Sequence, residues 1–322
     1  MSGPAVEVRG LRKAYGETEA VADLSFEVAA GEIVGLIGPD GAGKTTTMRI
    51  ICGLLRPDAG EVAVLGMDVR HDARRIKERL GYMPQRFSLY PDLSVQENLR
   101  FFADLFGVTG EERRRQEERL LRFSRLADFR QRRAGRLSGG MKQKLALSCT
   151  LIHTPAVLLL DEPTTGVDPV SRQEFWRILR DLAGEGLALL VSTPYMDEAE
   201  LCDRVLLMHR GRVIAAGTPA AVAARHERTL AEVSGPDLDR ARDRLREVPR
   251  VDVHRFGDRL HVSFPADLST GDLEGRLKDV EVRIEQVEPT IEDAFVDLVG
   301  NAESGDGATP DRRPEARSEE TA

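Results

Sequence analysis

A glycine-rich loop that ends in one lysine and two threonines follows a short apolar run. The segment GPDGAGKTT matches the pattern G-x-x-x-x-G-K-[ST]. Glycines let backbone N–H groups turn toward an anion, and a helix that begins there adds positive potential. Lys44 then reaches the β- and γ-phosphates of a nucleotide, and Thr45 supplies an oxygen ligand for Mg²⁺. The predicted phosphate site comprises Gly38, Pro39, Asp40, Gly41, Ala42, Gly43, Lys44, Thr45 and Thr46, of which Asp40 adds an unusual negative charge to an anion-binding loop.

Two carboxylates follow a second apolar run, in the segment LLLDEP. A strand of aliphatic residues delivers Asp161 to the end of the sheet near Mg²⁺, directly or through water. Glu162 then faces the water that attacks the γ-phosphate, which a carboxylate polarises or deprotonates. An isolated Asp-Glu pair would be explained as the acidic end of a strand, and its pairing with the loop at Gly38 favours the catalytic interpretation.

The elements that must position these groups alternate between strand and helix. Residues 5–30 alternate apolar and polar around turn signals, which predicts an antiparallel hairpin region. Further predicted elements are strands at 32–38, 156–163 and 187–193, a helix from 43 to 55, a charge-rich helical segment at 87–147 and a hairpin at 204–217. This order predicts an α/β domain with a largely parallel sheet, modified by an antiparallel start and a helical insertion.

The pattern changes after residue 218. We predict a domain at 1–218 with a helical subdomain at about 87–148, a small α+β module at 219–300 for regulation or dimerisation, and a disordered tail at 301–322. The module should contain short strands, with helices at 238–247 and 273–277. The tail is polar, with glycine, proline and charges and almost no large apolar residues.

Composition restricts the partners. The net charge of −8 argues against a broad nucleic-acid-binding surface. The three cysteines are far apart and lack the spacing of metal ligands, so they are expected to be buried residues of a reducing compartment. The N-terminus lacks the pattern of a signal peptide. No apolar run approaches the ~20 residues needed to cross a bilayer, so a membrane role would require a partner.

The segment LSGGMKQKLAL at 137–147 is hard to explain as structure alone, although Ser-Gly-Gly could be a helix cap and turn. It resembles the signature motif of ABC-transporter ATPases, and the resemblance covers about residues 5–218 with every expected motif in order. It implies a P-loop NTPase fold of ABC type, with ATP and Mg²⁺ as ligands and two ATPase domains packed head to tail. Ser138, Gly139 and Gly140 would then contact the γ-phosphate held by the partner subunit.

Three further positions match this family one by one. By the resemblance, Tyr15 stacks on adenine, Gln85 senses Mg²⁺ and the γ-phosphate, and Asp168 links the two sites of the dimer. The helical segment after Gln85 would contact a membrane subunit. Alternatively, Tyr15 is a turn aromatic that packs on the sheet, and Asp168 belongs to an Asp-Pro turn. The implied metal ligands are Thr45, Gln85 and Asp161.

Pro194 departs from the family pattern, which has a histidine that bonds the γ-phosphate there. Proline has no side-chain donor and no backbone N–H, but it suits the first turn of a helix, which Ser192 or Thr193 could cap. The implied catalytic residues are therefore Lys44, Gln85, Glu162 and Pro194 in the histidine position. Loss of one transition-state donor can cost about 10²–10³ in rate.

Three accounts of Pro194 stay open. The site hydrolyses ATP slowly with Glu162, or it pairs with a different subunit that keeps the histidine, or it binds ATP and clamps without turnover. The single ATPase domain, the segment PYMDEAE and the C-terminal extension resemble the subunits of daunorubicin-type drug exporters.

The expected function is that of an exporter's ATPase subunit. It would lie at the cytoplasmic face of the membrane, in a homo- or heterodimer, with a separate integral membrane permease. The alternative is a non-transport ABC ATPase or nucleotide-gated clamp.

Overall fold

Continuous apolar runs form the inner strands of a six-stranded sheet in the computed structural model, which describes residues 3–86 and 89–305. Every residue is buried in β3 (Ile33–Ile37), β7 (Val157–Asp161) and β8 (Ala188–Thr193). The strand order is β10-β9-β3-β8-β7-β6, with β6 at Leu80–Met83, β9 at Arg204–His209 and β10 at Arg212–Gly217. Only β10 runs antiparallel to its neighbour. Parallel strands covered on both faces have this near-continuous apolar pattern.

A second sheet is antiparallel and has the order β2-β1-β4-β5. The predicted hairpin is confirmed as β1 (Val6–Tyr15) and β2 (Thr18–Val28). The strands β4 (Ala59–Val64) and β5 (Met67–Asp68) complete the sheet, although sequence analysis assigned no element there. Because β4 pairs with β1 some fifty residues away in the chain, local sequence carried little signal for it.

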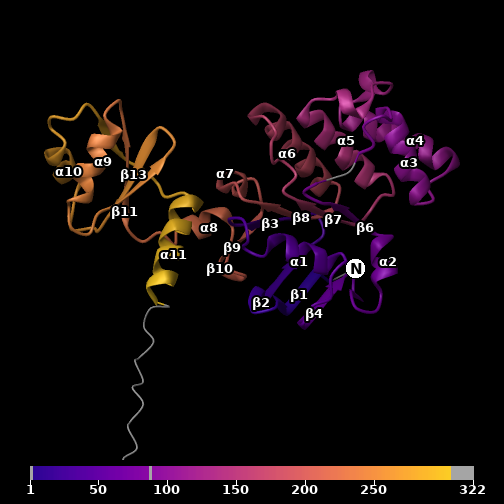
Figure 1. Cartoon of the computed structure of the whole chain (residues 1–322), viewed down its shortest axis with the longest axis horizontal. Helices are drawn as coiled ribbons and strands as arrows, with labels where there is room; N and C mark the ends of the chain where they lie inside the picture. Colours follow the sequence, from indigo (N-terminus) through magenta and orange to yellow (C-terminus); the bar gives the residue numbers. More distant parts are fainter. Residues whose placement is uncertain (1–2, 87–88, 306–322) are drawn as a thin grey trace, which may run out of the picture. The chain divides into compact units, whose positions relative to one another are not determined.

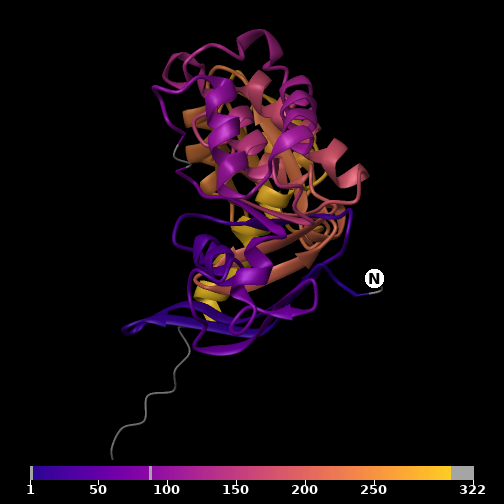
Figure 2. The ribbon, with the colours of Figure 1, turned by 90° about the vertical axis from the view of Figure 1, so that its right-hand side faces the viewer.

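Helices occupy both faces of the six-stranded sheet. The helix α1 (Lys44–Ile51) packs against strands of both sheets, and buried side chains of α1, β1 and β7 share one hydrophobic core. Four helices lie on the other side of the six-stranded sheet from β1 and β2 (Figure 1, Figure 2): α3 (Val95–Leu105), α4 (Gly110–Phe123), α5 (Gly139–Leu151) and α6 (Pro169–Gly184). The remaining helices in the described residues up to 224 are α2 (Ala73–Lys77), η1 (Ala127–Phe129), η2 (Ala134–Arg136), α7 (Met196–Ala199) and α8 (Pro219–Ala223). The predicted helical insertion and mixed sheet are confirmed.

The C-terminal unit has a βαββαβ order followed by one more helix. Its antiparallel sheet has the order β12-β13-β11-β14. The elements are β11 (Thr229–Ser234), α9 (Leu238–Arg246), β12 (Asp252–Phe256), β13 (Arg259–Phe264), α10 (Thr270–Arg276), β14 (Arg283–Gln286) and α11 (Ile291–Gly305). This is the split βαβ arrangement, and it confirms the predicted α+β class.

The chain divides into two compact units, Met1–Ala224 and Arg225–Ala322. The first includes α8, which the sequence analysis placed in the C-terminal module. The helix α11 continues to Gly305, into the segment assigned to the tail, and residues 306–322 of that tail lie outside the described residues. No helix within the described ranges is long and apolar enough to cross a membrane.

Candidate nucleotide site

The glycine-rich loop wraps around the N-terminus of α1. Lys44 Nζ donates to the carbonyl oxygens of Gly38 at 2.7 Å and Pro39 at 3.0 Å, so the lysine side chain folds back beneath the loop. Gly43 has φ 102°, and a side chain there would overlap the carbonyl of Ala20. Only glycine suits both constraints. The loop therefore lies at the N-terminus of α1, where backbone N–H groups and the helix dipole favour an anion.

A cavity of about 500 Å³ collects most of the predicted site residues. Its size suits a nucleotide-sized ligand. It is lined by Tyr15, Ala20, Asp40, Gly41, Ala42, Gly43, Lys44, Thr45, Thr46, Gln85 and Glu162. Tyr15 is the last residue of β1, beside the turn to β2, and is 50% exposed, so its ring is not buried against the sheet. Four separate segments of the chain thus converge on one cavity: residues 15–20, residues 40–46, Gln85 and Glu162.

The residues predicted to hold Mg²⁺ fit a hard cation in part. Thr45 Oγ1 lies 3.1 Å from Asp161 Oδ1, which places a hydroxyl beside a carboxylate. Oxygen ligands of this kind suit Mg²⁺. Ser192 Oγ donates to the same carboxylate oxygen at 2.6 Å, a contact that sequence analysis missed. Burial and the adjacent Asp161 together raise the pKa of Tyr82, whose hydroxyl lies 3.4 Å from Asp161 Oδ2.

Glu162 sits between the loop lysine and Gln85. Its Oε1 is 3.4 Å from Lys44 Nζ, and its Oε2 accepts from Gln85 Nε2 at 2.8 Å. Gln85 thus contacts Glu162 rather than the Thr45–Asp161 pair. Glu162 is 6% exposed and has φ 51°, a conformation that is costly for a residue with a side chain. The strand end therefore turns sharply to direct this carboxylate toward the cavity.

The LSGG segment lies outside this cavity. Ser138 caps α5 by accepting from the Met141 N–H at 3.3 Å, as predicted. Gly140 packs so closely on α6 that a Cβ would lie 2.5 Å from Ser171 Cβ, so its lack of a side chain serves helix packing. Gly139 is exposed at the helix start. The chain itself thus places this segment apart from its own phosphate loop.

One further contact caps α6, and another joins α5 to α6. Asp168 caps α6 by accepting from the Ser171 N–H at 2.9 Å, which lowers the pKa of its carboxyl. Lys144 pairs with Glu174, and this hydrogen bond holds the pKa of Glu174 below its usual range. The LSGG segment and Asp168 are therefore held on two locked helices.

Pro194 lies before α7 rather than in its first turn. The helix begins at Met196, with Tyr195 in the cap position and no side-chain cap, so the expected capping by Ser192 or Thr193 is wrong. Thr193 Oγ1 instead accepts from the Tyr195 N–H at 3.1 Å, and Ser192 faces Asp161. Neither hydroxyl therefore caps α7, and the Ser192 bond to Asp161, 31 residues away, could not be read from local sequence.

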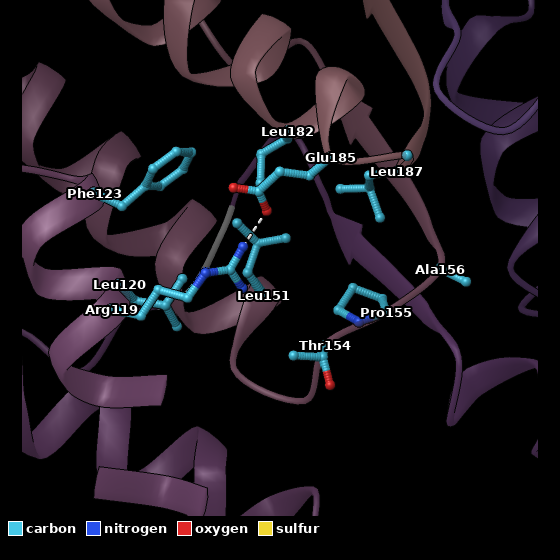
Figure 3. Close-up of a pocket in the computed structure, with 11 residues that line it drawn as sticks. Arg119, Leu120, Phe123, Leu151, Thr154, Pro155, Ala156, Leu182, Glu185 and Leu187 are labelled. Carbon is cyan, nitrogen blue, oxygen red and sulfur yellow. Dashed lines mark hydrogen bonds and ion pairs between the residues drawn. The ribbon is translucent and has the colours of Figure 1, made fainter. Parts of the chain in front are cut away.

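A different cavity, of about 240 Å³, lies at the N-terminal ends of β7 and β8, away from the phosphate loop. Figure 3 shows its lining side chains, with Arg119 of α4 facing Glu185 across it; the two form an ion pair. None of the predicted site residues lines it. It is therefore separate from the candidate site.

Comparison with known proteins identifies the family. The ABC transporter profile matches residues 21–165. The probable multidrug ABC transporter ATP-binding protein YbhF of Escherichia coli (strain K12) is 43% identical over 94% of this chain, which spans 53% of that relative. The chain thus spans about half the length of the first curated relatives it matches.

Two other proteins match over nearly their whole length. The Nod factor export ATP-binding protein I of Bradyrhizobium diazoefficiens is 40% identical over 93% of this chain and 98% of its own. A dimeric ATP-binding cassette in a post-hydrolysis state, bound to ADP and Pi, is 27% identical with a TM-score of 0.60 and covers 66% of this chain and 98% of that chain. The chain therefore belongs to the family of ABC transporter ATP-binding proteins.

Proposed function

We propose that this chain is the ATP-hydrolysing subunit of an exporter, acting with a second ATPase subunit and a separate membrane permease. The observation that carries the proposal is the single cavity that joins the glycine-rich loop, Tyr15, Gln85 and Glu162. The names of relatives, which include multidrug and Nod factor export proteins, support export as the direction of transport. The proposed location of the subunit is the cytoplasmic face of the cell membrane.

The residues of the cavity supply a mechanism of hydrolysis. The loop N–H groups and Lys44 bind the β- and γ-phosphates, and Tyr15 stacks on the adenine. Thr45 and Asp161 would hold Mg²⁺, which when bound neutralises charge on the phosphate oxygens. Glu162 orients and deprotonates the attacking water. With phosphate bound, Lys44 has a competing anion, so Glu162 is freed to face that water while Gln85 holds its other oxygen.

A second ATPase subunit completes the site. Ser138, Gly139 and the cap residue Asp168 lie outside the cavity of their own chain, on helices locked by Lys144 and Glu174. Their N–H and carboxylate groups are proposed to face the γ-phosphate and the site of the partner. The dimeric structure among the related folds supports this arrangement. ATP would close the dimer, and hydrolysis would reopen it.

Pro194 is proposed to slow this reaction without stopping it. It offers no donor to the γ-phosphate, so one transition-state contact is missing. Lys44 and Glu162 nevertheless lie within 3.4 Å of each other in the cavity, and a pure clamp would not need that carboxylate. Slow hydrolysis is therefore favoured over clamping without turnover.

The face proposed to meet the permease lies on the helical subdomain. Tyr90, Phe101, Leu105 and Phe106 are large apolar side chains that are 38–66% exposed. Tyr90 and Phe101 also form an edge-on aromatic pair with centroids 4.5 Å apart. Beside them lies a groove of about 390 Å³ whose lining includes Gln85. A helix inserted there would reach the residue that holds Glu162, which couples transport to hydrolysis.

Affinity purification of the full chain from detergent-solubilised membranes tests this proposal. We expect a multi-span membrane protein to be retained, together with a second ATPase chain if the dimer is mixed. Leu105→Asp places a charge on the proposed face and should reduce retention at least about tenfold, the effect of roughly 1.4 kcal/mol. Leu54→Asp is the matched control, since Leu54 is 56% exposed after α1.

Two outcomes would contradict the proposal. Retention of no membrane protein by the wild type would favour the non-transport clamp. Equal loss with both variants would remove the helical subdomain as the permease-binding face.

A further inference from the structure

A buried carboxylate joins the two chain segments that carry Glu162 and Pro194. Glu198, on α7, is 1% exposed. Its Oε1 accepts from Thr164 Oγ1 and its Oε2 from Thr193 Oγ1, each at 2.6 Å. Thr164 lies two residues after Glu162, and Thr193 ends β8 directly before Pro194. One side chain therefore bridges the two loops that leave β7 and β8.

The path of the chain through Pro194 depends on this bridge. Proline cannot donate a backbone hydrogen bond, so the turn is held from its flanks. The Tyr195 N–H donates to Thr193 Oγ1 at 3.1 Å, while that hydroxyl donates to Glu198. Both hydrogen-bonding roles of the Thr193 hydroxyl are thus in use, and each fixes one side of residue 194.

A cation from α6 offsets the buried charge. Arg172 Nε lies 3.5 Å from Glu198 Oε1, and the guanidinium sits 4.3 Å from the centroid of the Tyr195 ring. A second nitrogen of Arg172 pairs with Asp197 at 3.3 Å. A buried carboxylate with two hydroxyl donors and a nearby cation is held in one position. The bridge is therefore a defined arrangement rather than a mobile contact.

The backbone of Glu162 is also bonded directly to β8. Its N–H bonds the carbonyl oxygen and the hydroxyl of Ser192, both at 3.1 Å. Ser192 thus restrains Glu162 itself. Glu198 restrains the segment after Glu162, because it bonds Thr164. Because φ of Glu162 is 51°, this conformation needs such external support.

We infer that Glu198 is a positioning residue for ATP hydrolysis: by joining Thr164 to Thr193 it sets the relative placement of Glu162 and residue 194 at the γ-phosphate. The inference rests on the proposed ATPase function. It assigns the bridge no contact with nucleotide. A misplacement of about 1 Å at a reacting group can cost about 100-fold in rate, so a residue outside the cavity can control turnover.

Steady-state hydrolysis by the purified full chain tests the role of Glu198. In Glu198→Gln the amide keeps the shape but replaces one acceptor with a donor, so one threonine hydroxyl loses the acceptor of its hydrogen bond. We expect kcat to fall by about tenfold to 100-fold while the Kd for ATP changes by less than about twofold. Glu200→Gln is the matched control, since it removes the same charge from an exposed side chain two residues away and should leave kcat unchanged.

Substitutions at Thr164 separate positioning from general stability. Thr164→Ser keeps the hydroxyl and should retain most of kcat, whereas the isosteric Thr164→Val removes it and should reproduce the loss. Adding Glu198→Gln to Thr164→Val should lower kcat much less than the product of the single effects, because both break one bridge. Thermal unfolding is recorded for every variant.

The outcomes distinguish this inference from the function on which it rests. A wild type without ATPase activity refutes the proposed function, and the inference with it. An active wild type with unchanged kcat in Glu198→Gln refutes the inference alone. It is also refuted if ATP affinity and thermal stability fall in parallel with kcat, or if Thr164→Ser loses as much activity as Thr164→Val.

Discussion

Replacing Glu162 with glutamine separates catalysis from nucleotide binding. Glu162 Oε2 accepts from Gln85 Nε2 at 2.8 Å, and the amide oxygen of the variant keeps that bond. The two hydrogen bonds to Ser192 are donated by the backbone N–H of Glu162, so the substitution does not change them. The substitution therefore removes the charge and the proton acceptor but leaves the fold intact.

The expected loss of activity follows from the role of a general base. Proton transfer by a positioned side chain contributes about 10²–10⁴-fold, so Glu162→Gln should lower kcat by at least about 100-fold. ATP binding should tighten at the same time. Two unit charges about 4 Å apart interact by about 4 kcal/mol at an effective dielectric near 20. Even a third of that repulsion between Glu162 and the γ-phosphate corresponds to about tenfold in affinity.

Three measurements on the purified protein check this prediction. Phosphate release with and without Mg²⁺ gives kcat, equilibrium binding gives the affinity for ATP, and size-exclusion chromatography with ATP reports the dimer. We expect activity that depends on Mg²⁺ in the wild type, and an inactive, ATP-stabilised dimer in Glu162→Gln. Equal turnover by the two proteins would show that Glu162 is not the base.

Other substitutions test other parts of the structure. Pro194→His should leave thermal unfolding unchanged and should not lower kcat, because residue 194 precedes α7 and is not needed to begin it; a large loss of activity would mean that the site requires proline. Gly140→Ala places a Cβ 2.5 Å from that of Ser171, so it should lower the free energy of unfolding by about 1–3 kcal/mol in denaturant titrations, and an unchanged midpoint would contradict the close packing of α5 on α6. The hydrogen bond that His261 Nδ1 donates to Asp293 Oδ1 raises the pKa of His261, more than burial lowers it. This pair therefore stabilises the C-terminal unit fully below the ordinary histidine pKa of about 6.5 and loses that contribution as pH rises through the raised value. Thermal melts near pH 6 and pH 9 should differ less in Asp293→Asn than in the wild type, and equal differences would exclude the pair as a source of pH dependence.

Local chemistry explains what could be predicted from sequence. The loop at Gly38, the strand that ends at Asp161 and the cap at Ser138 each depend on residues within a few positions of one another. Glycine conformation, apolar runs and hydroxyl caps act over that range. The family resemblance then supplied roles for residues such as Gln85 whose own types carry little information.

The fold and the site also contain features with no local signal. The strand β4 joins β1 by pairing across the chain, and sequence analysis did not assign it. The expected capping at Pro194 was wrong because Ser192 and Thr193 hydrogen-bond to Asp161 and Glu198 instead. A hydroxyl can cap a helix or bond a carboxylate equally well, so the side chains that pack beside Ser192 and Thr193 decide which bond forms.

The sequence by itself determined the chemistry available to this protein: a phosphate loop, two carboxylates after a buried strand, a signature segment and a proline in place of a histidine. Tertiary structure decided which groups meet. It brings Thr45 within 3.1 Å of Asp161, 116 residues away, and Thr164 within 2.6 Å of Glu198, 34 residues away. Strand order brings these side chains into contact, because parallel strands end at a common edge whatever their separation in sequence. The bridge at Glu198 depends on the same strand order, because it joins Thr164 after β7 to Thr193 at the end of β8.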